Sequence, residues 1–375
     1  MPKIEIKEKD LTLNSLLEYT DNYILMVDSK LNSGTTPKVL TTKECAVDKF
    51  CKKVDDLGGH IIAAKDWTQA KDYCKDRNQF NVKFILCNEV EGEATADPIE
   101  LTNALEIATA RKDCAVIYTK ITTTFSEKEK AALKKEVPYK SGFFDDEKRT
   151  EQGKYVIALY GNIHEKNDLK SKITAGQGYI LAFLNNISKG AAEWWSVAGS
   201  KRGEIPGYVV DDFIKESEID DMQSRTTADS IAINPIVNMN PYGTRIWGIR
   251  TCLPNVLPEG AKEGSDLLVA TSFANIRIAL CDIKKQIYQA GRSVQFEQDT
   301  DVLWVNFKSK VNSLLEEMKS SYGIVGYRWY RDKQNEKRAE LRAVLQIVPV
   351  EAVEDIYVSV ELKDELGATT VTTSE

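Results

Sequence analysis

The amino-acid sequence predicts an α/β fold (α+β overall), with an α/β layer in the N-terminal part and a C-terminal unit of two long helices and a small sheet. In the first 150 residues, short apolar runs alternate with helical patterns that carry their own start signals. From residue 266 onward, two long helical repeats precede two segments in which apolar and polar residues alternate. Apolar strands between amphipathic helices are typical of a mainly parallel sheet covered on both faces.

The N-terminal layer is expected to contain four strands and four helices. The strands are the apolar runs at residues 23–28, 60–64, 82–87 and 114–119. The helix starts are Thr41 with Glu44, Asp66 with Gln69, Asp97 followed by Pro98 and Glu100, and Ser126 with Glu129.

The middle of the chain begins after a charged, glycine-containing stretch at residues 140–153, which is the one plausible domain boundary. A strand is expected at 155–161 and a buried helix at 178–188. Residues 188–221 are rich in glycine, serine and charge and are expected to form long loops. Trp194 and Trp195 in this stretch are interpreted as packing anchors rather than as a ligand platform.

The C-terminal unit starts with a helical repeat from Asp266 to Ala290, and Gly291 stands where a left-handed C-cap residue is usual. Asp299 or Thr300 is expected to cap a second helix that ends before Gly323. Residues 341–349 and 355–362 alternate with period two and are expected to be strands.

Composition restricts the class of protein. The chain has 375 residues, 42% of them hydrophobic and 29% charged, which is ordinary for a globular protein. No apolar run approaches the ~20 residues that span a bilayer, and the N-terminus lacks a signal peptide's apolar segment, so we expect a cytoplasmic product. The formal net charge of −7 argues against a nucleic-acid coat.

Basic residues and cysteines leave alternatives open. Arg277, Lys284, Lys285 and Arg292 form a local basic patch, either a solvated helix face or a subunit contact. The seven cysteines contain no C-x-x-C pair, so reduced thiols are expected, with a disulfide formed after cell lysis as the alternative.

Catalytic and metal-binding motifs are absent from the sequence. It contains no P-loop, no dinucleotide-binding glycine motif, no nucleophile elbow and no H-E-x-x-H. His164 and Glu165 are adjacent on an expected surface turn, where they do not converge on a substrate. We therefore expect no enzyme activity, no cofactor and no metal site.

Five segments, in order, resemble one protein family. They are YGTRIWGIRT (242–251), FANIRIALCDIKKQI (273–287), VQFEQDTDVLW (294–304), SYGIVGYR (321–328) and LQIVPVEAVEDIYVSVEL (345–362). The family is that of the contractile tail sheath proteins of bacteriophages and related injection machines. Gln298, Asp299 and Ile278 depart from the family pattern in the third and second segments.

The resemblance implies a structural subunit that forms hexameric rings or a six-start helix around a tail tube and contracts to drive the tube through a cell envelope. Its partners would be other copies of itself, the tail tube protein, and baseplate and tail terminator proteins, with no nucleic acid and no membrane insertion. The expected location is the virion, after assembly in the host bacterial cytoplasm.

The resemblance also divides the chain into four regions. Residues 1–20 and 351–375 are expected to be linking arms, 21–150 an outer α/β domain, and 151–350 the sheath core, whose small sheet is completed by arms of neighbouring subunits.

Two sets of residues are candidates for contacts between subunits. The buried anchors of the arms are expected to be Ile4, Ile6, Ile356, Val358 and Val360. The alternative is that both terminal strands pair within their own subunit. The candidates for the tube-facing surface are Lys308, Lys310, Glu316, Glu317 and Lys319, and a solvated helix face is the alternative for each. A cytosolic α/β enzyme and a static shell or tube protein remain as alternative functions.

Overall fold

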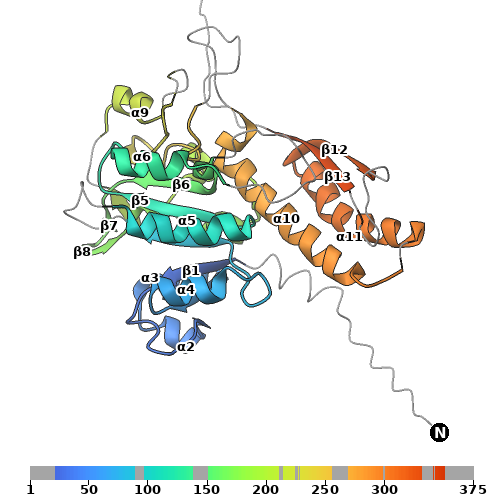
Figure 1. Ribbon diagram of the computed structural model, residues 1–375. Helices are drawn as coiled ribbons and strands as arrows, with labels where there is room; N and C mark the ends of the chain where they lie inside the picture. The colour runs from blue at the N-terminus through green and yellow to red at the C-terminus, as the bar shows by residue number, and fades with distance from the viewer. Residues whose placement is uncertain are drawn as a thin grey trace, which may run out of the picture.

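A computed structural model describes residues 22–88, 97–137, 151–210, 214–223, 227, 229–255, 269–298, 300–331, 341 and 343–350. Within these residues the strands form an eight-stranded sheet, a three-stranded sheet and a two-stranded sheet. Figure 1 shows the large sheet and its helices as one body, with α10 beside it and α11 and the two-stranded sheet on the far side of α10.

The large sheet has the strand order β11-β10-β6-β5-β4-β1-β3-β2. Its strands are β1 (Tyr23–Val27), β2 (Lys38–Val39), β3 (His60–Ala64), β4 (Phe84–Asn88), β5 (Ala115–Lys120), β6 (Val156–Tyr160), β10 (Asn234–Met239) and β11 (Gly243–Ile246). The pairs from β3 through β1, β4, β5 and β6 to β10 are parallel, and the two outermost strands are antiparallel. The mainly parallel sheet and all five strands expected up to residue 161 are therefore confirmed.

Successive residues of each strand point to opposite sides of the sheet. Apolar side chains on both sides are covered by helices. On one face, Ile24 and Phe84 join the side chains of α3 (Lys49–Asp56) and α7 (Ala175–Ser188). On the other face, Leu25 and Ile85 join those of α4 (Trp67–Cys74) and α5 (Ile99–Arg111). Each fully buried aliphatic side chain contributes about 1.5–3 kcal/mol, so this double-sided core is the main source of stability in the α/β layer.

The start signals of the helices are mostly where the sequence places them. Thr41 and Glu44 form a capping box at α2 (Thr42–Cys45), and Ser126 and Glu129 form one at α6 (Glu127–Lys134). The Asp66 carboxylate accepts the backbone N–H of Gln69 at 2.8 Å. At α5 the N-cap residue is Pro98, one residue later than the expected Asp97.

Helix α7 starts three residues earlier than expected. Thr174 is its N-cap residue and accepts the backbone N–H of Gln177 at 3.2 Å, while the Gln177 side chain accepts the N–H of Thr174 at 3.0 Å. This capping box lies just before the apolar run on which the prediction was based. The prediction that the helix is buried is confirmed, because residues on all its sides are inaccessible.

The stretch expected to be long loops is partly ordered, so that prediction was wrong in part. It contains α8 (Gly199–Arg202), β9 (Tyr208–Val210) and the start of α9 (Glu216–Met222). Strand β9 pairs with β7 (Ile163–Glu165), which also pairs with β8 (Asp168–Ile173). His164 is consequently buried in the central strand of a small sheet, and its expected place on a surface turn was wrong.

The C-terminal unit consists of α10 (Ala274–Val294), α11 (Asp301–Ser320), β12 (Ile324–Arg331) and β13 (Ala343–Pro349). The short 3-10 helix η2 (Ala270–Ser272) contacts α10, whereas η1 (Gln152–Tyr155) contacts α5 and α6 of the α/β layer. The two long helices and the strand at 341–349 are confirmed. Thr300 caps α11 by accepting the backbone N–H of Leu303 at 3.2 Å.

Both ends of α10 differ from the prediction. Its start shifts from Asp266 to Ala274 because Phe273 is extended and forms a β-bridge with Arg250. Its end lies beyond Gly291, which is inside the helix, and the last residue, Val294, packs against the cluster that α11 completes. The predicted C-cap at Gly291 was therefore wrong, because tertiary packing extends the helix.

Strands β6, β10 and β11 come after residue 151 yet continue the sheet formed by the first 150 residues. The division into residues 21–150 and 151–350 thus does not separate two sheets, and it stays a prediction about roles in an assembly. The predicted arms, including the strand at 355–362, lie outside the described residues.

Candidate subunit interface

The C-terminal unit has a core of its own between α10, α11 and the β12–β13 sheet. Phe307, Val311, Leu315 and Met318 form the buried stripe of α11. The rings of Trp304 and Phe307 stack with centroids 5.9 Å apart, and both meet the Trp329 ring of β12 edge-on.

Two neighbouring tryptophans attach the end of α7 to this unit. Trp195 donates its indole N–H to the carbonyl of Ser321 at 2.7 Å. Trp194 packs so closely on Gly323 that a Cβ there would lie 2.4 Å from the indole Cδ1. The interpretation of both tryptophans as packing anchors is confirmed.

The β12–β13 sheet is the part of the unit that is most open to further pairing. Its strands are antiparallel, and within the described residues neither has a second neighbour. Its inner face packs on α11, where Trp329 donates to Asn312 at 2.9 Å and Tyr327 to Glu316 at 2.7 Å. A two-stranded sheet is marginally stable without such packing, and its free edges can accept further strands.

Three large apolar side chains of this unit are exposed. Val325 is 63% exposed, Val348 58% and Phe296 98%. Single exposed apolar side chains are common on protein surfaces. Val325 and Val348 belong to the paired strands β12 and β13, whereas Phe296 lies in the turn between α10 and α11.

The five predicted tube-facing residues do not form one continuous face of α11. At about 100° per residue, Lys308, Glu316 and Lys319 lie on one side, and Lys310 and Glu317 lie on another. Lys308 stacks over the Trp304 ring at 5.1 Å, while Lys310 turns toward α10 and donates to the Ser293 hydroxyl at 2.6 Å. Glu316, Glu317 and Lys319 are exposed.

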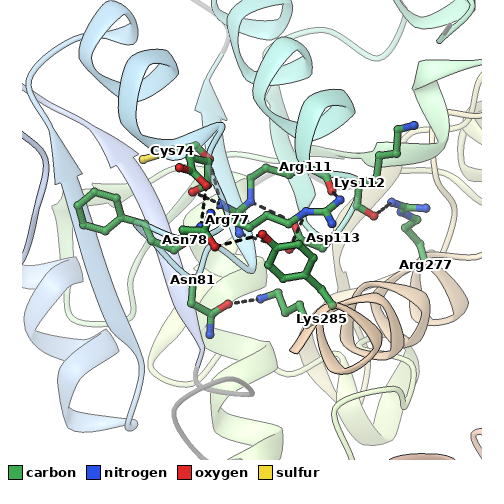
Figure 2. A network of polar contacts seen from close by, with 12 residues as sticks. Cys74, Arg77, Asn78, Asn81, Arg111, Lys112, Asp113, Arg277 and Lys285 are labelled. Atoms are coloured by element: carbon green, nitrogen blue, oxygen red, sulfur yellow. Dashed lines mark hydrogen bonds and ion pairs between the residues drawn. The ribbon is translucent and has the colours of Figure 1, made fainter. Parts of the chain in front are cut away.

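A polar network joins α10 to the α/β layer at the end of α5 (Figure 2). The Arg111 guanidinium is buried and donates to the carbonyls of Cys74 at 3.0 Å and Phe80 at 2.9 Å. It also pairs with Asp113 at 3.0 Å, and Arg77 lies 3.7 Å from the same carboxylate. These contacts fix the loop between α4 and β4 to the end of α5.

Helix α10 contributes three side chains to this network. Arg277 donates to the carbonyl of Lys112 at 3.2 Å, Lys285 to the Asn81 side chain at 2.7 Å, and Tyr288 to that of Asn78 at 3.1 Å. Arg277 is 1% exposed and Lys285 2%. Neither alternative for the basic patch, a solvated face or a subunit contact, holds for these two residues, because they bind the α/β layer of the same chain.

A triad of charged side chains, Lys83, Asp282 and Glu193, forms a second contact between α10 and the α/β layer. The Lys83 ammonium lies 3.1 Å from the Asp282 carboxylate of α10 and also binds Glu193. Burial, and secondarily repulsion from Glu193, raises the pKa of Asp282 to about 6, although Lys83 opposes this shift. Burial disfavours the charged form of Lys83, but its two carboxylate partners outweigh that effect and raise its pKa.

Other predicted features can be placed only in part. The arm residues Ile4, Ile6, Ile356, Val358 and Val360 lie outside the described residues.

All seven cysteines are buried and unbridged, and burial raises the pKa of the Cys74 and Cys114 thiols to about 12. Among the described residues, no group of His, Cys, Asp or Glu side chains has the arrangement of a metal site. In that same part of the chain, no helix has the length and apolar character of a membrane span.

Comparison with known proteins finds solved structures of similar fold. Neither a protein-family model nor a curated protein sequence matches the chain. It is similar to a chain of the PVC sheath complex, an extracellular contractile injection system in its contracted state, with a TM-score of 0.60 and 14% identity over 98% of both chains. The two chains share one fold.

A second similar chain belongs to the 6-fold symmetrised baseplate of the anti-feeding prophage (AFP). The TM-score is 0.58 and the identity 10%, over 97% of this chain and 99% of that chain. The α/β fold expected from the sequence is confirmed, and it is shared with both of these chains.

Proposed function

We propose that the chain is a structural subunit of a contractile sheath. Copies would polymerise as hexameric rings or a six-start helix around an inner tail tube, and contraction would drive the tube through the envelope of a target cell. Self-association, the tube protein, the baseplate and a tail terminator are the interactions that this function requires.

The observation that carries the proposal is the similarity to the chain of the PVC sheath complex over 98% of both chains. A shared core alone would fit many α/β proteins, because one fold hosts many functions. Here the similarity includes the helical hairpin and the small sheet as well as the α/β layer. The similar AFP chain comes from a baseplate, which supports a place in the same kind of particle.

The kind of particle can be stated more broadly than the sequence suggested. A bacteriophage virion is the expectation from sequence, whereas the two similar structures come from the PVC extracellular contractile injection system and the AFP baseplate. The proposal therefore covers contractile particles in general, assembled in a bacterial cytoplasm, with phage tails as one case.

Linkage between subunits is proposed to use the β12–β13 sheet as acceptor. Each strand added to a free edge forms a ladder of backbone hydrogen bonds, while its connection can bend as a hinge. Residues 1–20 and 351–375 are the proposed donors, with Ile4 and Ile6 anchoring one arm and Ile356, Val358 and Val360 the other. The exposed Val325 and Val348 supply an apolar surface that such strands could cover.

Contact with the tube is proposed to involve the charged surface of α11. Exposed ion pairs are worth only about 0–1 kcal/mol each, which suits a surface that must release the tube. Because Lys308, Glu316 and Lys319 share one side of the helix, they are the better group for this role. Lys310 and Glu317 would then contact a neighbouring subunit or solvent.

Contraction requires no nucleotide in this proposal, since the free energy is stored at assembly. Two packings of one chain can differ by about a few kcal/mol per subunit, and a polymer sums that difference. The residues 21–150 would lie on the outside of the sheath and 151–350 would form its wall, with the sheet that crosses this boundary moving as a rigid body.

Negative-stain electron microscopy of the purified chain tests the proposal. We expect hollow cylinders, and we expect that deletion of residues 1–12 leaves a soluble monomer. Discrete small particles at every concentration would favour an α/β enzyme, which a metabolite screen by thermal shift would then reveal. Cylinders of a single diameter under all conditions would favour a static shell or tube.

A further inference from the structure

A cavity of about 270 Å³ lies where α10 meets the α/β layer, and its lining is strongly cationic. Arg77, Lys112, Lys154 and Lys284 line it together with aromatic and aliphatic side chains. None of the described residues that line the cavity carries a carboxylate. The chain as a whole is acidic, so this concentration of positive charge is not a consequence of composition.

The four cations come from four separate parts of the chain. Arg77 follows α4, Lys112 is the C-cap of α5, Lys154 lies in η1, and Lys284 projects from α10. A solvated helix face would place its cations on one element. Here the fold brings them together around one space.

The two arginines at this site are already engaged. Arg77 donates to the carbonyl of Arg111 and lies 3.7 Å from Asp113, a carboxylate that Arg111 shares. Arg277 stacks on the Tyr155 ring at 4.0 Å behind the cavity wall and donates to Lys112, but its Nε has no hydrogen-bond partner among the described residues.

Two of the three lining lysines, Lys154 and Lys284, have no such polar partner among the described residues, although the Lys154 ammonium lies 5.5 Å from the centroid of the Tyr155 ring. Over the described part of the chain, the ammonium groups of Lys154 and Lys284 have neither a hydrogen bond nor an ion pair, and both side chains are half-buried. Burial, followed by repulsion from Arg277, lowers the pKa of Lys284 to about 7 and that of Lys154 to about 8. A ligand with negative charge would relieve this repulsion.

We propose that this cavity binds a small phosphate-class oxyanion with two or more negative charges. Ammonium groups act as point charges toward phosphate oxygens, and a nearby guanidinium adds directed donors. The cavity suits a compact anion, and its open side admits either a free anion or the phosphate of a larger molecule. The bound anion would join α10 to η1 and to the end of α5, and so clamp the helical hairpin onto the α/β layer.

Isothermal titration calorimetry of the purified chain with inorganic pyrophosphate tests this site, with sodium chloride at matched ionic strength as the reference. We expect saturable binding by the unmodified chain, and affinity about tenfold or more weaker in the Lys154→Gln, Lys284→Gln double variant, since a hydrogen bond to a charged group is worth about 1.5–3 kcal/mol. The matched control, Lys43→Gln with Lys52→Gln, changes two exposed lysines elsewhere and should bind like the unmodified chain.

Titrations with two further ligands, ADP and citrate, identify the source of the anion. Equal binding of pyrophosphate and ADP means that only the phosphates are recognised, and tighter binding of ADP means that a phosphate ester is the ligand; both support the site. Binding of citrate as tight as that of pyrophosphate would overturn the phosphate assignment. Absence of saturable binding, or equal binding by the double variant, would overturn the site.

Acylation of lysines gives a readout that does not depend on a variant folding. With a pKa near 7, Lys284 should react with an amine-selective acetylating reagent at pH 7.5 faster than the exposed Lys319. Pyrophosphate should slow the reaction at Lys284 and leave Lys319 unchanged, as measured by peptide mass spectrometry. Equal rates at Lys284 with and without pyrophosphate would contradict the proposal.

Discussion

Replacement of Lys83 by Gln should be among the most destabilising single changes in the joint between α10 and the α/β layer. The ammonium of Lys83 neutralises Asp282 at 3.1 Å and binds Glu193, and both Lys83 and Asp282 are almost fully buried. Removal of one member of a buried ion pair typically costs about 3–5 kcal/mol, because the other charge is left uncompensated. We expect a loss of that size in the free energy of unfolding at pH 7.5.

The loss should be smaller at pH 5. In the folded chain the pKa of Asp282 is raised to about 6, against about 3.9 in an unfolded chain. An acid with a raised folded pKa destabilises the fold progressively as the pH rises from about 4 to 6 and fully above that window. Without Lys83 the pKa of Asp282 rises further, and each added unit costs about 1.4 kcal/mol at neutral pH. At pH 5 Asp282 is mostly protonated in both forms, so less is lost.

Urea unfolding followed by tryptophan fluorescence at pH 5.0 and 7.5 measures both effects. Lys319→Gln on the exposed side of α11 is the matched control and should change the free energy of unfolding by less than about 0.5 kcal/mol. A loss below about 1 kcal/mol at pH 7.5, or a loss that is the same at the two pH values, would refute the interpretation of the triad.

Three other changes test the C-terminal unit. Leu315→Ala removes a fully buried side chain from α11 and should cost about 2–5 kcal/mol in urea unfolding; a cost near zero would show that α11 is not packed there. Gly323→Ala places a Cβ 2.4 Å from the Trp194 ring and should cost about 1–3 kcal/mol, whereas Gly326→Ala, where nothing lies within 4 Å, serves as its control. Lys308→Glu with Lys319→Glu should leave monomer stability within about 1 kcal/mol but weaken co-sedimentation with the tube; unchanged co-sedimentation would remove these residues from the tube-facing surface.

The α/β layer could be predicted because its signals are local. Strands β1, β3, β4, β5 and β6 are each a short apolar run. The capping boxes at Thr41 and Ser126 mark helix starts through residues only three apart. Strand β12 was missed although Tyr327 and Trp329 alternate with Arg328 and Tyr330, because aromatic and charged residues weaken a simple hydrophobic pattern. Strand β8 was missed because its exposed sequence DLKSKI has almost no apolar face.

The joint between α10 and the α/β layer could not be predicted in this way. Arg111 binds carbonyls more than thirty positions earlier, and Lys83 meets Asp282 at a separation of 199 residues. Such contacts depend on how the elements are packed. The one available signal was the presence of Arg277, Lys284 and Lys285 among the apolar residues of α10. From the sequence alone, it was not possible to tell whether these side chains face solvent or protein.

Subunits of the proposed sheath are linked through strands added to the β12–β13 sheet. A cryo-EM reconstruction of the purified assembly that traces the main chain at each edge of this sheet measures it directly. We expect that a strand from residues 1–20 or 351–375 of an adjacent copy lies in register along β12 or β13. A sheet whose edges are covered only by the same copy's own termini would contradict it.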